Sequence, residues 1–161
     1  MEMAWESELA GFLTELLDVQ EETLQVLTRK REALAAVDTA RLAELAYDED
    51  GVIARLERCL ARREELLRQA AGEGLPSDSI HSLSSALPGP KRRNLAHQLN
   101  EATGRARLLR HHSLVNWVLA QRTLLHLSQL LEIIATGGRT RPTYCREDGA
   151  RAGGGLVNQV A

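Results

Sequence analysis

The chain has 161 residues, enough for one domain with a tail, and its 20 basic and 22 acidic residues leave a net charge of only -2. This balance gives the molecule as a whole no attraction to nucleic acid or another polyanion. Aromatic residues make up only 3% of the chain, whereas leucine, alanine, glutamate and arginine are abundant, a composition typical of long helices and coiled coils rather than of sheets.

The spacing of the cysteines and the lack of long apolar runs indicate the cellular compartment of the protein. Cys59 and Cys145 lie far apart in different contexts, which favours free thiols in a reducing compartment over a disulfide framework. The acidic opening MEMAWESELA lacks the basic and apolar regions of a signal peptide. No stretch approaches the roughly 18 apolar residues of a membrane-spanning helix. We therefore expect a cytoplasmic protein without membrane insertion.

The first predicted element is a helix over about residues 5–37. Leucines recur along it at three- and four-residue spacings, the pattern of a helix with one apolar face. At about 1.5 Å per residue this helix spans about 50 Å, which is typical of a coiled-coil-like bundle rather than of a compact globule. The apolar positions are Leu9, Leu13, Leu16, Leu17, Leu24, Leu27 and Leu34.

A second helix is expected over about residues 40–71. Asp38 or Thr39 can serve as its N-cap by accepting a backbone N–H, and Gly72 ends it. Gly51 weakens the helix locally by about 1 kcal/mol relative to alanine. Because a tight turn joins two long helices, they must be antiparallel neighbours. The inward positions are Leu42, Leu45, Val52, Ile53, Leu56, Leu60, Leu66 and Leu67.

A linker and a third long helix complete the predicted helical domain of residues 1–136. Residues 72–90 are rich in serine and proline and form the linker, with one short helical turn capped by Ser77. The third helix covers about residues 91–136, and its second half carries hydrophobic residues on more than one face. Either several helices surround that half or part of it is a groove for a partner. The inward positions of the first half are Leu95, Leu99, Ala102, Ala106 and Leu109.

The charges favour a parallel arrangement of the first and third helices. All charged residues of the first helix before Arg29 are acidic, whereas the third helix opens with the basic residues 91–93. In an up-down-up bundle these N-terminal halves lie side by side, and the acids offset the unfavourable placement of cations at a helix N-terminus. The alternative is that the basic half faces another molecule.

From Gly137 the chain changes to GGRTRPTYCREDGARAGGGLVNQVA, in which no helical period survives. This composition predicts a flexible tail over residues 137–161. The predicted fold is therefore all-α, with an elongated antiparallel helical hairpin, a third long helix in a coiled-coil-like three-helix bundle, and a C-terminal tail.

No pattern in the chain supports catalysis or a bound metal. His112 and His126 are about four helical turns apart, and no HExxH or Cys/His spacing is present. Cys59 lies on the apolar stripe of the second helix as a small buried hydrophobe, and Cys145 has no histidine near it in sequence to activate it. The basic run at 91–93 lacks the aromatic neighbours of a nucleic-acid site. We therefore predict no enzyme activity, no catalytic residue, no metal and no cofactor.

The function is instead expected to lie in binding. An apolar helix surface can accept an amphipathic helix of a partner, and a tail can add a weak contact strengthened by tethering. From the residues alone, the main alternative is a structural coiled coil or secretion-apparatus stalk protein that self-associates through the same surface.

Three stretches of the chain resemble the FlgN-like flagellar export chaperones. The first is LTELLDVQEETLQVLTRKREALAAVDTARLAEL, where a leucine-spaced helix ends in Lys-Arg-Glu-Ala-Leu and a short turn before an L-x-x-L restart. The second is IARLERCLARREELL. The third is a leucine-rich helix followed by a glycine break and then T-Y-x-x-x-x-G in TYCREDG.

The resemblance implies long antiparallel helices and a cytoplasmic chaperone of hook–filament junction proteins. It implies that the C-terminal helical region grips the amphipathic C-terminal helix of the partner and keeps the partner unassembled. It also implies that Tyr144 docks on the cytoplasmic domain of the export gate protein. The gripping residues carried over to this chain are Leu119, Leu124, Leu127, Leu131 and Ile134.

Overall fold

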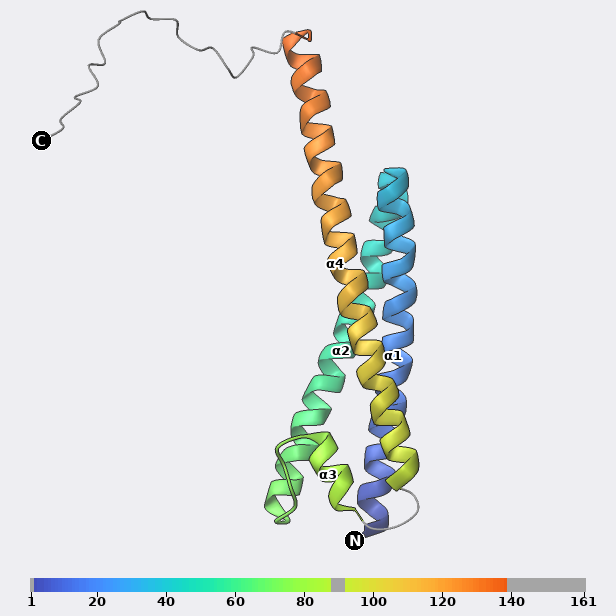
Figure 1. Ribbon diagram of the computed structural model, residues 1–161, viewed down its shortest axis with the longest axis vertical. Coiled ribbons are helices and arrows are strands. Elements are labelled where there is room, and N and C mark those ends of the chain that lie inside the picture. The colour runs from blue at the N-terminus through green and yellow to red at the C-terminus, as the bar shows by residue number, and fades with distance from the viewer. Residues whose placement is uncertain (1, 88–91, 139–161) are drawn as a thin grey trace, which may run out of the picture. The chain divides into compact units, whose positions relative to one another are not determined.

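The computed structural model describes residues 2–87 and 92–138, and within these ranges all regular structure is α-helical (Figure 1). The elements are α1 (Glu2–Ala36), α2 (Thr39–Gly72), α3 (Ile80–Ala86) and α4 (Arg92–Thr136). The predicted all-α class is confirmed. The chain divides into two compact units, Met1–Leu125 and His126–Ala161. Residues 139–161 of the predicted tail lie outside the described ranges.

The connection between α1 and α2 is two residues long and reverses the chain. The Asp38 N–H donates to the Ala33 carbonyl at 2.9 Å, while Val37 adopts the left-handed conformation with φ 54°. The Asp38 carboxylate then accepts the Arg41 N–H at 3.0 Å, which caps α2 as predicted. The two helices therefore run antiparallel, side by side (Figure 1).

Helix α2 buries a narrow seam rather than a broad face. Its buried residues Leu45, Val52, Cys59 and Leu66 recur at every seventh position, which is the repeat of a helix packed along one partner in a coiled coil. Positions beside such a seam stay open to solvent. Ile53 and Leu60 were predicted to point inward, and this prediction was wrong, since they are 49% and 54% exposed.

Helix α3 occupies the stretch that was expected to be a linker. Its N-cap is Ser79, whose hydroxyl accepts the Ser82 N–H at 3.0 Å, so the prediction of Ser77 as the cap was wrong. The apolar positions 80, 83 and 87 lie on one helical face and are all buried. They join a cluster in which all four helices meet: Trp5, Leu9, Phe12, Leu13, Val19, Cys59, Leu66, Ala70, Ile80, Leu83, Leu87 and Leu95.

Three side-chain hydrogen bonds to backbone carbonyls join α4 to α1. Arg105 donates to the Leu17 carbonyl at 2.9 Å, and Gln20 donates to the Ala102 carbonyl at 3.1 Å. Asn116 donates to the Leu27 carbonyl at 2.8 Å. Because the Asn116–Leu27 contact lies further along both helices than the other two contacts, α1 and α4 run parallel, as the charges had predicted.

The acidic residues of α1 were expected to pair with the basic residues of α4, but they pair with arginines of both α4 and α2. Arg105 of α4 lies 3.4 Å from Glu21, as predicted for the parallel pair. Glu22 and Glu8 of α1, however, pair with Arg55 and Arg62 of α2. Within the first half of α4, Leu95 and Ala102 are buried as predicted, whereas the prediction that Ala106 points inward was wrong, since it is exposed.

We expect Leu83→Ala to lower the free energy of unfolding by about 2–5 kcal/mol, because Leu83 is completely buried and its truncation leaves a cavity. Leu60→Ala removes the same atoms from an exposed site and should change the free energy by about 0.5 kcal/mol or less. Urea denaturation of both variants tests this. Equal effects would show that α3 is not part of the core.

Candidate functional site

The second half of α4 is apolar but contributes little to the core. Between residues 113 and 138 the only buried side chain is a polar one, Asn116, which is 4% exposed. Its hydrogen bond to Leu27 turns this side of α4 toward α1. The sequence left open whether other helices surround this half or whether it is exposed. In the described part of the chain, most of its large apolar side chains are exposed, and Val115 and Leu119 are half-buried.

In the first compact unit, the large exposed apolar side chains of this half are Leu114, Trp117, Val118, Leu124 and Leu125. In the second unit, they are Leu127, Leu130, Leu131, Ile133 and Ile134. Exposed apolar side chains in such number on consecutive turns mark an interaction surface rather than ordinary surface composition.

Three of the five residues predicted to grip a partner share one face of α4 within the second unit. Leu127, Leu131 and Ile134 follow one another at spacings of four and three, which places them on one side of the helix. Leu124 belongs to the first unit. All four are exposed. Leu119 is only half-buried and lies off this face by its position in the helical repeat. Tyr144, the predicted docking residue, lies outside the described residues.

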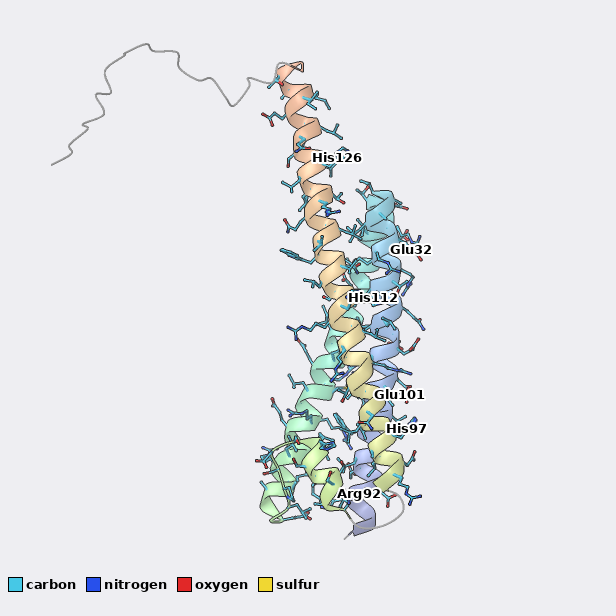
Figure 2. All side chains as sticks on the ribbon, in the orientation of Figure 1. Glu32, Arg92, His97, Glu101, His112 and His126 are labelled. Carbon is cyan, nitrogen blue, oxygen red and sulfur yellow. The ribbon has the colours of Figure 1, made fainter. Side chains whose placement is uncertain are left out.

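The histidines and Cys59 are the side chains of the helices that the sequence analysis considered as metal ligands or reactive groups. His97 and His112 lie at separate points along α4 (Figure 2). The described ranges contain no cluster of three or more His, Cys, Asp or Glu side chains able to hold a metal ion. Cys59 is a buried free thiol, as predicted. Burial, and then the Glu15 carboxylate, raise the pKa of the Cys59 thiol, outweighing the opposite influence of Arg55 and Arg58.

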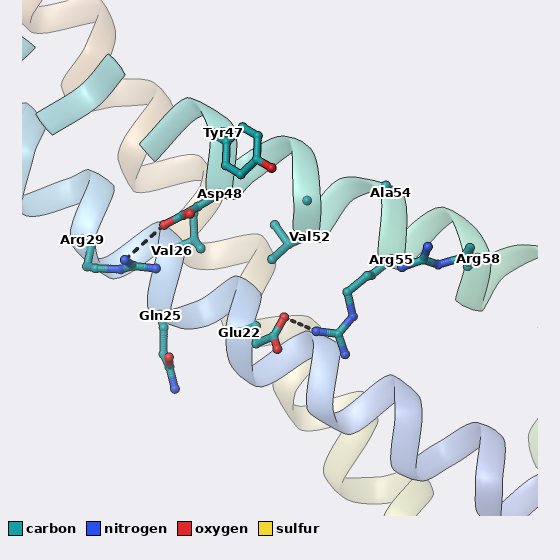
Figure 3. A pocket seen from close by; sticks show the side chains of 11 residues that line it. Glu22, Gln25, Val26, Arg29, Tyr47, Asp48, Val52, Ala54, Arg55 and Arg58 are labelled. Carbon is teal, nitrogen blue, oxygen red and sulfur yellow. Dashed lines mark hydrogen bonds and ion pairs between the residues drawn. The ribbon is translucent and has the colours of Figure 1, made fainter. Parts of the chain in front are cut away.

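A hollow of about 550 Å³ lies between α1 and α2 (Figure 3). Its charges are largely compensated, because Arg29 pairs with Asp48 at 3.2 Å and Arg55 pairs with Glu22. Tyr47 at its edge is 84% exposed, and no sequence pattern had pointed to it. This hollow is a crevice of the hairpin in which paired charges and apolar side chains lie side by side.

A second hollow, of about 360 Å³, lies where α1, α2 and α4 meet within the first unit. Its walls are mostly apolar, with Val26, Val52 and Leu109 contributed by the three helices in turn. Ile53, which had been expected in the core, lines it as well.

Within the described residues, no helix has the length and hydropathy that a membrane crossing requires.

Comparison with known protein families identifies the family of this chain, which its geometry alone does not. The family model described as FlgN protein matches residues 1–151. The chain belongs to the FlgN family. A search of the curated proteins and a search of the solved structures each found no match.

FlgN proteins are flagellar export chaperones that bind flagellar substrate proteins, and this chain is a chaperone of that kind. The match spans α1 to α4 and extends beyond the described helices to residue 151. The resemblance seen in the three sequence stretches is thus confirmed. An exposed apolar surface on α4 is what a FlgN chaperone needs in order to hold another protein.

We expect Cys59 of this FlgN chaperone to behave as a packing residue rather than as a reactive thiol. In a Cys145→Ala variant it is the single thiol of the chain. Its alkylation at pH 8 should be on the order of a hundredfold slower in the folded chain than in urea, because reaction requires local opening. The folded-state rate should keep rising above the usual thiol pKa, since the thiolate forms at higher pH. Equal rates in the two states would contradict this assignment.

Proposed function

We propose that this FlgN chaperone binds the amphipathic C-terminal helix of hook–filament junction proteins in the cytoplasm. In this proposal it keeps them unassembled and delivers them to the flagellar export gate. The observation that supports it is the exposed apolar face that Leu127, Leu131 and Ile134 form on α4, and the proposal also includes Leu124, which is exposed in the first unit. Leu119, half-buried at the edge of this region, contributes a flanking contact in the proposal.

The spacing of these residues fits the way in which one amphipathic helix binds another. A partner helix presents anchors at positions i, i+3, i+4 and i+7, which meet a matching run on the receiving helix. Burial of the exposed leucines on both sides provides the favourable free energy, at about 25 cal/mol for each Å² of apolar surface removed from water. The ordering of the partner segment offsets part of this gain, so micromolar affinity is expected.

The proposed role of Tyr144 is to contact the cytoplasmic domain of the export gate protein. Tyr144 follows the end of α4 by eight residues, which keeps it tethered close to the gripping surface. A tethered contact acts at a high effective concentration, so a weak tyrosine contact suffices once the substrate complex has reached the gate.

The decisive experiment is calorimetric titration of the full chain with C-terminal segments of junction proteins from the same genome. We expect saturable binding at micromolar or tighter concentrations, with the negative heat-capacity change of apolar burial. Leu131→Asp should weaken binding at least about tenfold, because a charge on an apolar face is costly to bury.

Leu60→Asp is the matched control, because Leu60 is a comparably exposed leucine on α2. This variant should bind the segments like the unmodified chain. Titrations without heat or complex formation at high micromolar chaperone would rule out the junction proteins as substrates. An equal loss in both variants would place the binding surface elsewhere.

We expect Tyr144→Ala to weaken binding to the isolated cytoplasmic domain of the export gate while leaving helicity and junction-segment binding unchanged. Tyr47→Ala is the matched control, since Tyr47 is the other tyrosine of the chain and is fully accessible on α2. Surface plasmon resonance on the gate domain and circular dichroism provide the two readouts. Loss of junction-segment binding in Tyr144→Ala would instead place the tyrosine in the gripping surface.

A further inference from the structure

Helix α4 contains no acidic residue between Glu101 and Glu132. Of the arginines in this stretch, Arg105 is neutralised by ion pairs with Glu21 and Glu101. The remaining three form no ion pair in the described part of the chain: Arg107, Arg110 and Arg122. The surface of α4 in this region therefore carries positive charge that no ion pair of the described residues neutralises, although Arg110 also lines the hollow that contains Glu49 of α2.

A stripe of large apolar side chains lies within the same stretch of α4. Leu114, Val118 and Leu125 are separated by four and seven residues, which aligns them on one face of the helix, with Trp117 beside them. Leu114, Trp117 and Leu125 are 59%, 60% and 63% exposed. We call these four residues the outer stripe, and all of them belong to the first compact unit.

The outer stripe faces away from the rest of the bundle. Asn116 precedes Val118 by two residues, so its side chain lies about 200° around the helix from Val118. Because Asn116 binds the Leu27 carbonyl of α1, the outer stripe is on the opposite side of α4. A shallow hollow of about 320 Å³ lies along it, with walls from Leu114, Val118 and Arg122 and their neighbours on α4.

The unpaired arginines border the outer stripe. Arg107 and Arg110 precede Leu114 by seven and four residues, and Arg122 follows Val118 by four, so each is a helical neighbour of an apolar residue in the stripe. Apolar side chains framed by like charges are complementary to an amphipathic helix of opposite charge. We propose that the outer stripe is a docking surface for a helical segment of a partner protein that carries acidic residues beside its apolar face.

A second copy of the chain is a poorer occupant of this surface. In a symmetric dimer the same patch would appear on both sides of the interface. The unpaired arginines of both copies would then approach one another, and this stretch of α4 offers no carboxylate to neutralise them. Like charges brought together in this way suppress association.

An anionic membrane or a nucleic acid is also a poorer occupant. All charged residues of α1 before Arg29 are acidic, α1 lies against α4, and the whole chain has a net charge of -2. A polyanion that approaches α4 therefore meets repulsion from α1, whereas a short acidic helix is small enough to contact the outer stripe alone.

The outer stripe contains none of the five residues assigned to the binding of junction proteins, and only Leu119 of those five lines the hollow beside it, so the two proposals can fail separately. The test uses the full chain and two synthetic amphipathic peptides with the same leucine face. One peptide carries glutamates beside that face, and the other carries lysines at the same positions. Binding is followed by the emission of exposed Trp117, since the other tryptophan, Trp5, is buried.

We expect the glutamate peptide to bind about tenfold more tightly than the lysine peptide at low salt, a difference of about 1.4 kcal/mol. The preference should disappear near 1 M salt, where charges are screened beyond about 3 Å. Leu114→Asp should abolish binding, whereas Leu60→Asp, at a leucine of similar exposure on α2, should not. The double variant Arg110→Glu, Arg122→Glu should prefer the lysine peptide, whereas Arg58→Glu, at an exposed position on α2, should leave the preference unchanged.

Three results would overturn the proposal. Equal affinity for the two peptides would show that charge does not select the occupant. A dimer detected by light scattering that Leu114→Asp dissociates would assign the surface to a second copy. A blue shift of Trp117 on phosphatidylglycerol vesicles, with no response to either peptide, would assign it to a membrane. Circular dichroism verifies folding, and Val118→Ser replaces Leu114→Asp if that variant unfolds.

Discussion

The apolar cluster around Leu9 and Leu13 is the contact on which the rest of the described structure depends. All four helices contribute to it, α1 with its N-terminal half, α2 with its C-terminal half, α3 with one whole face and α4 with Leu95. Because the cluster gathers the first part of α4, the apolar residues that follow Asn116 take no part in it. The chain thus folds around one end of its helices and leaves a second apolar surface exposed.

The polar seam between α1 and α4 determines which side of α4 becomes that surface. Gln20, Arg105 and Asn116 each donate to a carbonyl of the facing helix, which favours one parallel alignment over helices shifted along one another. The buried side-chain oxygens of Gln20 and Asn116 accept no hydrogen bond from the described residues, so the seam specifies orientation more than it adds stability. Once Asn116 is directed to α1, the outer stripe must face solvent.

Exposed leucines are a liability for an isolated protein, because they promote non-specific association. In a FlgN chaperone, which binds flagellar substrate proteins, an apolar surface that the fold itself does not cover is available for such binding. The two faces of α4 differ in character. The face of Leu127 and Leu131 is apolar, whereas the outer stripe is framed by unpaired arginines. We infer that the first suits a substrate helix and that the second selects its partner by charge.

The sequence by itself determined the helical class, the α1–α2 hairpin and the membership of the FlgN family, because helical periodicity, turn signals and family motifs are local properties of the chain. It left the cap of α2 open between Asp38 and Thr39, and the structure gives Asp38. It also showed that the second half of α4 is too apolar for a single buried face. The tertiary structure alone decided which apolar residues are covered. Ile53 and Leu60 follow the helical period yet remain exposed, because α2 packs along a narrow seam, and residues 80–87 look like a linker yet complete the core. Periodicity defines a face, but only the packing of other helices determines whether that face is buried.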